Sequence, residues 1–82
     1  MSLGKYREQL DNLDRDMFKI LEKRFEICKD IGKWKKGNNK PVEDLERERQ
    51  IIESKIKLSS LPKEFIEELF KLIIRQSKEL QR

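Results

Sequence analysis

Residues 5–36 read KYREQLDNLDRDMFKILEKRFEICKDIGKWKK, and this stretch decides the fold. It contains no proline and only one glycine. Apolar side chains recur in it at alternating spacings of four and three residues, with one arginine among them: Tyr6, Leu10, Leu13, Met17, Ile20, Arg24, Ile27 and Ile31. This spacing is typical of a heptad-like helix. The stretch therefore predicts a single long α-helix from about Lys5 to Lys36.

Two shorter helices are expected after the long one. The residues Gly-Asn-Asn at 37–39 end the first helix. A second helix is expected from about Glu43 to Leu58, because acidic residues fill its first turn and apolar residues share one side. Pro62 fits the first turn of a third helix that runs toward Leu80. No segment has a convincing strand pattern, so the chain is predicted to be all-α.

The length of the first helix constrains the architecture. A helix of about 32 residues is roughly 48 Å long, whereas a compact chain of this size is only about 30 Å across. The helix must therefore project beyond its own fold, and its apolar stripe then needs a partner. We predict a three-helix chain with a long first helix, forming one domain over residues 1–82 and an intertwined homodimer with antiparallel long helices.

Composition excludes several classes of function. The chain has 20 basic and 16 acidic residues, which are interleaved rather than blocked, so no nucleic-acid partner is expected. No apolar run approaches the length of a membrane span and no signal peptide is recognisable, so we expect a cytoplasmic protein without a membrane partner. The absence of histidine argues against Ser-His and Cys-His nucleophile pairs and common zinc sites. Neither a metal nor a cofactor is expected, and Cys28 is interpreted as a small buried hydrophobe.

Polar residues occupy positions where an apolar helix stripe should continue: Arg24, Glu48, Ser77 and Gln81. Burying unpaired charge is costly, so their convergence on one core predicts a polar, anionic ligand between the helices. Lys35 shares a helix face with Arg24, and the two cations are suited to a dicarboxylate. Taken singly, each residue has a simpler interpretation: a snorkelling arginine, a cation at a helix C-terminus, or a frayed last turn.

Two other groups of charged residues have similar alternatives. Asp44, Arg47 and Glu48 share one side of the second helix, where they either contact a ligand or stabilise the helix N-terminus and form a surface ion pair. Arg7 lies 17 residues before Arg24, which is roughly 25 Å along a helix. It can serve the same ligand only from a second subunit, and it is otherwise a surface residue.

Taken together, these residues resemble the all-helical (type II) chorismate mutase family from Tyr6 to Gln81. The matching pieces are Tyr6-Arg7-Glu8, Leu13-Asp14, Lys23-Arg24, Ile31-Gly32-Lys33-Trp34-Lys35, Pro41-Val42-Glu43-Asp44, Arg47-Glu48, Phe70, Ile73-Ile74 and Ser77 to Gln81. The resemblance implies rearrangement of chorismate to prephenate in aromatic amino-acid biosynthesis, without a cofactor, in an interlocked dimer.

The resemblance also implies a role for each site residue. Arg24 and Arg7 of the other subunit would bind the substrate carboxylates, helped by Arg47 and Ser77. Asp44 and Glu48 would hold the ring hydroxyl, and Lys35 and Gln81 would donate to the ether oxygen. The amide of Gln81 is neutral, so no acid requirement is expected from this position.

Other functions remain open from the sequence. An isochorismate-pyruvate lyase shares this helical fold and uses a related substrate. A non-catalytic helical dimerisation or regulatory module is the alternative from a different class.

Overall fold

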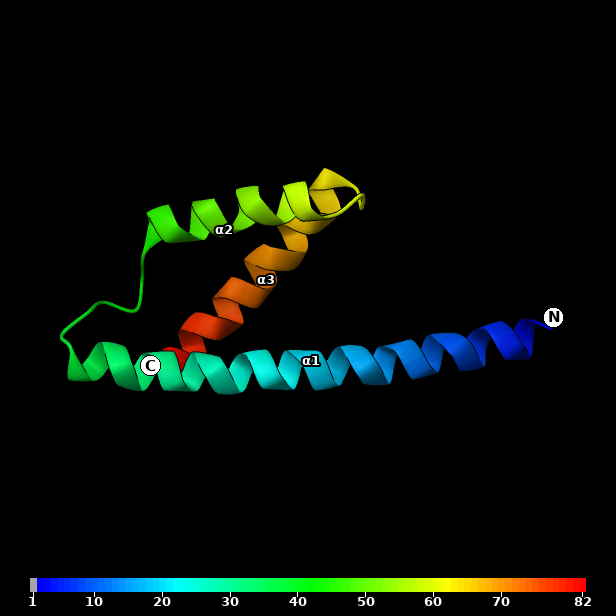
Figure 1. Cartoon of the computed structure of the whole chain (residues 1–82), viewed down its shortest axis with the longest axis horizontal. Coiled ribbons are helices and arrows are strands. Elements are labelled where there is room, and N and C mark those ends of the chain that lie inside the picture. Colours follow the sequence, from blue (N-terminus) through cyan, green and yellow to red (C-terminus); the bar gives the residue numbers. More distant parts are fainter. Residues whose placement is uncertain (1) are drawn as a thin grey trace.

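The computed structural model describes residues 2–82 and contains three helices in that range. They are α1 (Leu3–Gly37), α2 (Leu45–Leu58) and α3 (Lys63–Gln81), and no strand occurs in the described range. The prediction of an all-α chain with a long first helix is confirmed. In Figure 1, α2 lies above the C-terminal part of α1 and is separated from it, while α3 crosses from one to the other.

The helix ends follow from local hydrogen bonding. The Ser2 hydroxyl caps α1 by accepting from the backbone N–H of Lys5. At the other end, Asn38 is the C-cap and Asn39 has a φ of 54°, so this asparagine takes the left-handed conformation that reverses the chain. Gly37, which the sequence pattern placed in the terminating turn, is the last helical residue and has no positive φ.

The starts of the other two helices differ slightly from the predictions. Asp44 is the N-cap of α2, where its Oδ1 accepts from the backbone N–H of Arg47 at 3.0 Å, so the helix begins two residues after Glu43. Pro62 is the N-cap of α3 rather than a residue of its first turn, and it makes no side-chain cap. These shifts are of the size expected at helix ends.

The core is small and lies on α3. Ile66 is 2% exposed and Ile73 is 9% exposed, and these are the buried apolar side chains of the described chain. Gly32 of α1 is also buried, because the last turn of α3 packs directly against it. A Cβ at this position would lie 2.6 Å from the Cα of Gln81, so only glycine permits this approach. Helix α3 thus contacts both α1 and α2 and holds them together.

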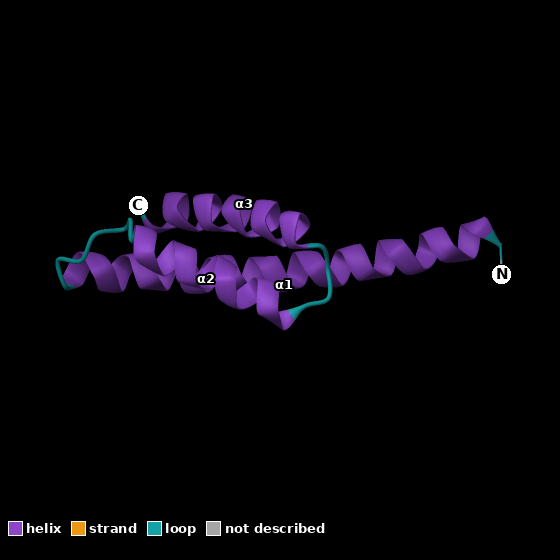
Figure 2. Ribbon diagram, turned by 90° about the horizontal axis from the view of Figure 1, so that it is seen from above, coloured by secondary structure: helices purple, strands orange, loops and turns teal. Residues whose placement is uncertain are grey.

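The N-terminal half of α1 projects away from the rest of the chain (Figure 2). The molecule measures 55 × 24 × 16 Å, and its radius of gyration of 16.0 Å exceeds the value of about 12 Å for a compact chain of this length. Its accessible surface of 6981 Å² exceeds the value of about 5,200 Å² expected for a folded monomer of this mass. The predicted projection of the first helix is confirmed.

The projecting segment carries an uncovered apolar stripe. Exposed side chains along it include Tyr6, Leu10, Leu13, Met17 and Ile20, each about half exposed or more. An apolar stripe of this length is unusual on a soluble monomer and is typical of an interaction surface. The homodimer that would cover it stays a prediction. No helix formed by residues 2–82 has the length and apolar character to cross a bilayer.

Candidate functional site

A cavity of about 330 Å³ lies between the C-terminal half of α1, the start of α2 and the end of α3. Every predicted site residue except Arg7 lines it: Arg24, Lys35, Asp44, Arg47, Glu48, Ser77 and Gln81. Its apolar wall comes from Ile31, Val42, Ile51, Ile73 and Ile74, together with Cys28. The structure therefore brings together polar residues that lie up to 57 positions apart in sequence, from Arg24 to Gln81.

Lys35 is the most firmly held cation of the cavity. Its Nζ donates to Oε1 of Gln81 at 2.7 Å and to the backbone carbonyl of Val42 at 3.0 Å. An ammonium has three N–H donors, so one remains for a ligand. Since an ammonium cannot accept, the Gln81 oxygen must face it, which leaves the amide N–H groups of Gln81 free to donate elsewhere. A frayed C-terminus is not observed, because α3 continues to Gln81.

Arg24 lies at the edge of the cavity and is stacked on an aromatic ring. Its guanidinium carbon is 5.8 Å from the centroid of the Phe70 ring, within the range of a cation–π contact. The residue remains exposed and also lines the cavity. Phe70 thus orients a cation from α1 toward the site.

Asp44 and Arg47 are expected from the sequence either to contact a ligand or to stabilise the helix N-terminus and form a surface ion pair. Asp44 stabilises the helix N-terminus through its cap, and it also lines the cavity. Arg47 is exposed, and no ion pair involves its side chain within residues 2–82, so the expected surface ion pair is absent there. Its guanidinium is available at the cavity.

Ser77 faces the cavity from α3. Its hydroxyl donates to the backbone carbonyl of Ile73 at 2.8 Å, the back-bonding pattern common for serine inside a helix. The hydroxyl oxygen keeps its acceptor capacity, and rotation of the O–H group would turn it into a donor for a ligand.

Glu48 pairs with a residue that the sequence interpretation missed. Lys78 Nζ lies 3.1 Å from Oε1 of Glu48 and 3.7 Å from Oε1 of Glu43. Glu48 and Lys78 are each 21% exposed, and both line the cavity. The signal that could have found Lys78 is its position four residues after Ile74, which continues one edge of the apolar face of α3.

The cavity has an excess of positive charge. Arg24, Lys35, Arg47 and Lys78 contribute four cations, and Asp44 and Glu48 contribute two carboxylates, so the difference is two positive charges. Such an excess in a partly enclosed, apolar-walled site attracts a dianion.

The shifted pKa values of the chain belong to a different surface. On α2, Arg49 donates to Glu46 and to Glu53, and these three side chains are more than half exposed. The hydrogen bond from Arg49 and its charge lower the pKa of Glu46, and the same contact with Glu46 raises the pKa of Arg49. This is an ordinary surface ion pair with no contact to the cavity.

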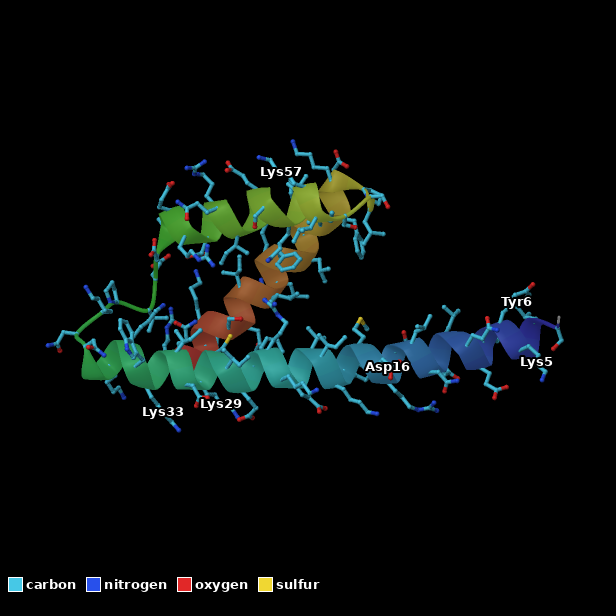
Figure 3. All side chains as sticks on the ribbon, in the orientation of Figure 1. Lys5, Tyr6, Asp16, Lys29, Lys33 and Lys57 are labelled. Carbon is cyan, nitrogen blue, oxygen red and sulfur yellow. The ribbon has the colours of Figure 1, made fainter. Side chains whose placement is uncertain are left out.

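Arg7 is not brought to the cavity of its own chain. It is exposed on the projecting part of α1, and Figure 3 shows the neighbouring Lys5 and Tyr6 at the far end of this helix, away from α2 and α3. Lys29 and Lys33 point from α1 away from α2 in the same view. The basic residues of α1 therefore do not all serve one site.

Comparison with known proteins identifies the family. The family model for chorismate mutase type II matches residues 6–82. The bifunctional chorismate mutase/prephenate dehydratase of Escherichia coli is 36% identical over 74 residues, which are 87% of this chain and 19% of that protein. The enzyme of the same name from Buchnera aphidicola subsp. Acyrthosiphon pisum is 34% identical over 79 residues, which are 93% of this chain and 20% of that protein.

A solved structure agrees with these matches. A conserved hypothetical protein from Pyrococcus furiosus superposes with a TM-score of 0.82 at 34% identity, covering 98% of this chain and 95% of that one. The chain spans about a fifth of the length of the bifunctional relatives that it matches. The matched segment contains every predicted site residue, so the resemblance seen in the sequence is confirmed, and the chain belongs to the type II chorismate mutase family.

Proposed function

We propose that this chain catalyses the rearrangement of chorismate to prephenate, a step of aromatic amino-acid biosynthesis. The observation that carries the proposal is the cavity between the three helices. In it Lys35 is hydrogen-bonded to Gln81, and the cationic side chains outnumber the carboxylates. Membership of the type II family supports the same reaction.

The chemistry requires little beyond this residue set. In the rearrangement one C–O bond breaks and one C–C bond forms in a concerted [3,3] shift, with no nucleophile and no obligatory proton transfer. The site has to hold a flexible dianion in its reactive chair conformer, which removes an entropic part of the barrier. The apolar wall restricts the ligand, and the cations fix its two carboxylates.

Lys35 and Gln81 supply the electrostatic part of catalysis. Negative charge grows on the ether oxygen as the C–O bond breaks. The unused N–H of Lys35 and the free amide N–H groups of Gln81 are donors that need no reorganisation when this charge develops. The Gln81 amide is neutral, so no acid requirement arises from this position.

The remaining site residues bind the substrate. Arg24 and Arg47 hold the carboxylates, with Ser77 as a further hydrogen-bonding partner. Glu48 accepts from the ring hydroxyl, and Asp44 lies beside it at the N-terminus of α2.

A second copy of the chain completes the site. The uncovered stripe on α1 and the excess accessible surface support an intertwined, two-fold dimer in which the long helices pack antiparallel. In that arrangement Arg7 of the partner subunit reaches the cavity and provides a further guanidinium that binds a substrate carboxylate.

The direct test follows purified protein mixed with chorismate and identifies the product. Formation of prephenate supports the proposal. The same protein is then mixed with isochorismate, and release of pyruvate without any prephenate from chorismate would favour a lyase instead. A folded dimer that converts neither compound would indicate a non-catalytic module.

A subunit-mixing experiment tests the contribution across the dimer. Arg7→Ala and Lys35→Ala chains are each expected to be nearly inactive. A mixed dimer has one site with both residues intact, so refolding the two chains together at equal amounts should restore roughly a quarter of the parent activity. No recovery in verified mixed dimers would contradict a site shared between subunits.

A further inference from the structure

Lys78 is a cavity residue to which neither the sequence pattern nor the proposed chemistry gives a role. Its side chain is 21% exposed, and it lies on α3 directly after Ser77 and three residues before Gln81. Its Nζ contacts Oε1 of Glu48 on α2 at 3.1 Å, and Oε1 of Glu43 lies 3.7 Å away. It therefore links α3 to the start of α2 across the cavity.

The partner of Lys78 is left with an unsatisfied atom. Oε1 of Glu48 accepts from Lys78, whereas Oε2 of Glu48 is buried and has no hydrogen-bond donor within residues 2–82. A carboxylate oxygen removed from water without a donor is destabilising, and such groups are rare in folded proteins. The Glu48 carboxylate is therefore stabilised when a ligand supplies the missing donor.

We propose that Lys78 is a positioning residue for Glu48, which it holds by one oxygen so that the other oxygen accepts from the ring hydroxyl of the bound substrate. This inference rests on the proposed function, because the ring hydroxyl is the donor that chorismate would bring to Glu48. An exposed glutamate samples many rotamers, and the ion pair with Lys78 removes part of that freedom before the ligand binds.

A purely structural role is the competing explanation. An ion pair between α2 and α3 would stabilise the fold, and its loss would lower the melting temperature without selective effect on substrate. A positioning role predicts a different result: the substrate binds more weakly, and the rate at which the bound substrate is converted changes little. The ring hydroxyl is bound in the ground state and in the transition state alike. Weakening its hydrogen bond to Glu48 therefore changes chiefly KM.

The test measures steady-state kinetics with chorismate at fixed ionic strength for the parent dimer and for Lys78→Met, which keeps length but removes charge. We expect kcat/KM to fall about ten- to a hundredfold, the range for a lost hydrogen bond to a charged group, with most of the change in KM. Lys78→Arg should recover most of the loss. Should Lys78→Met fail to give a folded dimer, Lys78→Gln provides the neutral comparison.

The matched control is Lys71→Met, since Lys71 lies on the same helix, is 60% exposed and, within the described part of the chain, pairs only with Glu68 at 3.8 Å. It is expected to leave both constants within about twofold of the parent, because surface ion pairs of this kind contribute little.

A double-mutant cycle separates action through Glu48 from a direct effect of the Lys78 charge. In the Glu48→Gln background, Lys78→Met should cause no further loss, because the two residues act as one unit. An equal loss in both backgrounds would overturn the positioning role. So would a Lys78→Met enzyme with parent kinetics and a lowered melting temperature. A parent chain that fails to convert chorismate would instead overturn the proposed function, and this inference with it.

Discussion

The two halves of α1 have the same sequence pattern but different surroundings. Residues 3–20 carry the heptad stripe entirely in the open, with every side chain exposed. In residues 21–37 the stripe members Arg24, Ile27 and Ile31 are also exposed. The half-buried Leu21, Phe25, Cys28 and Lys35 and the buried Gly32 form a neighbouring row, one position further along the helix, with the same spacing. Periodicity therefore gives only the approximate side of a helix that is covered, and the packing of the other helices decides which row is covered and over what length.

The reason for the difference is the length of the covering helix. The 19 residues of α3 extend only about 28 Å, against about 52 Å for the 35 residues of α1. One chain can therefore cover only part of its own first helix. Its cavity forms on the covered half, and in the proposed dimer a second copy covers the open half.

The largest expected effect lies in the covered half. Lys35→Met keeps the length of the side chain but removes the donor to Gln81 and, in the proposed mechanism, to the ether oxygen. By analogy with oxyanion-hole donors, kcat should fall about 10²–10³-fold. The matched control is Lys36→Met, one position along the helix, whose exposed side chain does not line this cavity. Chorismate turnover is measured for both, and equal activities would remove the proposed role of Lys35.

The next effect concerns the open half. Leu13→Asp places a charge in the exposed stripe, where the proposed dimer would bury it. Burial of an unpaired charge costs several kcal/mol, so the dimer dissociation constant should rise at least about a hundredfold. Activity should fall in parallel, since Arg7 of the partner subunit is no longer supplied.

Sedimentation equilibrium checks this second prediction across a range of protein concentrations. Asn12→Asp is the matched control, because it adds the same charge one residue away, outside the stripe. If both variants stayed dimeric with parent affinity, the stripe would not be the dimer interface. If Leu13→Asp became monomeric but kept full turnover, the site would be complete within one chain.

The comparison also shows what the sequence could predict. Helix type and approximate bounds follow from local signals, the apolar period and the Gly, Asn and Pro positions between the helices. Arg24, Glu48, Ser77 and Gln81 could be selected because each interrupts an apolar stripe, and the structure places all four at one cavity. Their convergence is what a local pattern implies once the helices pack.

Other features depend on how the helices approach one another. Lys78 is one of 20 basic residues and looks like a surface lysine until α2 places Glu48 beside it. The stacking of Arg24 on Phe70 likewise joins side chains from two helices whose crossing no local pattern specifies. The role of Arg7 depends on a second chain, so it stays a prediction.

The smallest expected effect compares two glycines, one in each half of α1. Gly32→Ala would put a Cβ 2.6 Å from the backbone of Gln81, so α3 must shift away from α1. Overpacking of this kind costs about 1–3 kcal/mol of unfolding free energy. Gly4→Ala is the control, because among residues 2–82 its Cβ would meet only the Ser2 hydroxyl, at 3.8 Å, and helix propensity makes it neutral or slightly stabilising.

Urea unfolding of both alanine variants measures this difference, and kinetics with chorismate adds a second readout. The shift of α3 that Gly32→Ala requires would also move Gln81 relative to Lys35. It would therefore disturb the hydrogen bond of 2.7 Å from Lys35 Nζ to Gln81 Oε1. Turnover should therefore fall together with stability in Gly32→Ala and stay at the parent level in Gly4→Ala. A Gly32→Ala chain with unchanged stability and turnover would show that the close approach of α1 and α3 is not needed to assemble the site, and the covered half would then resemble the open one.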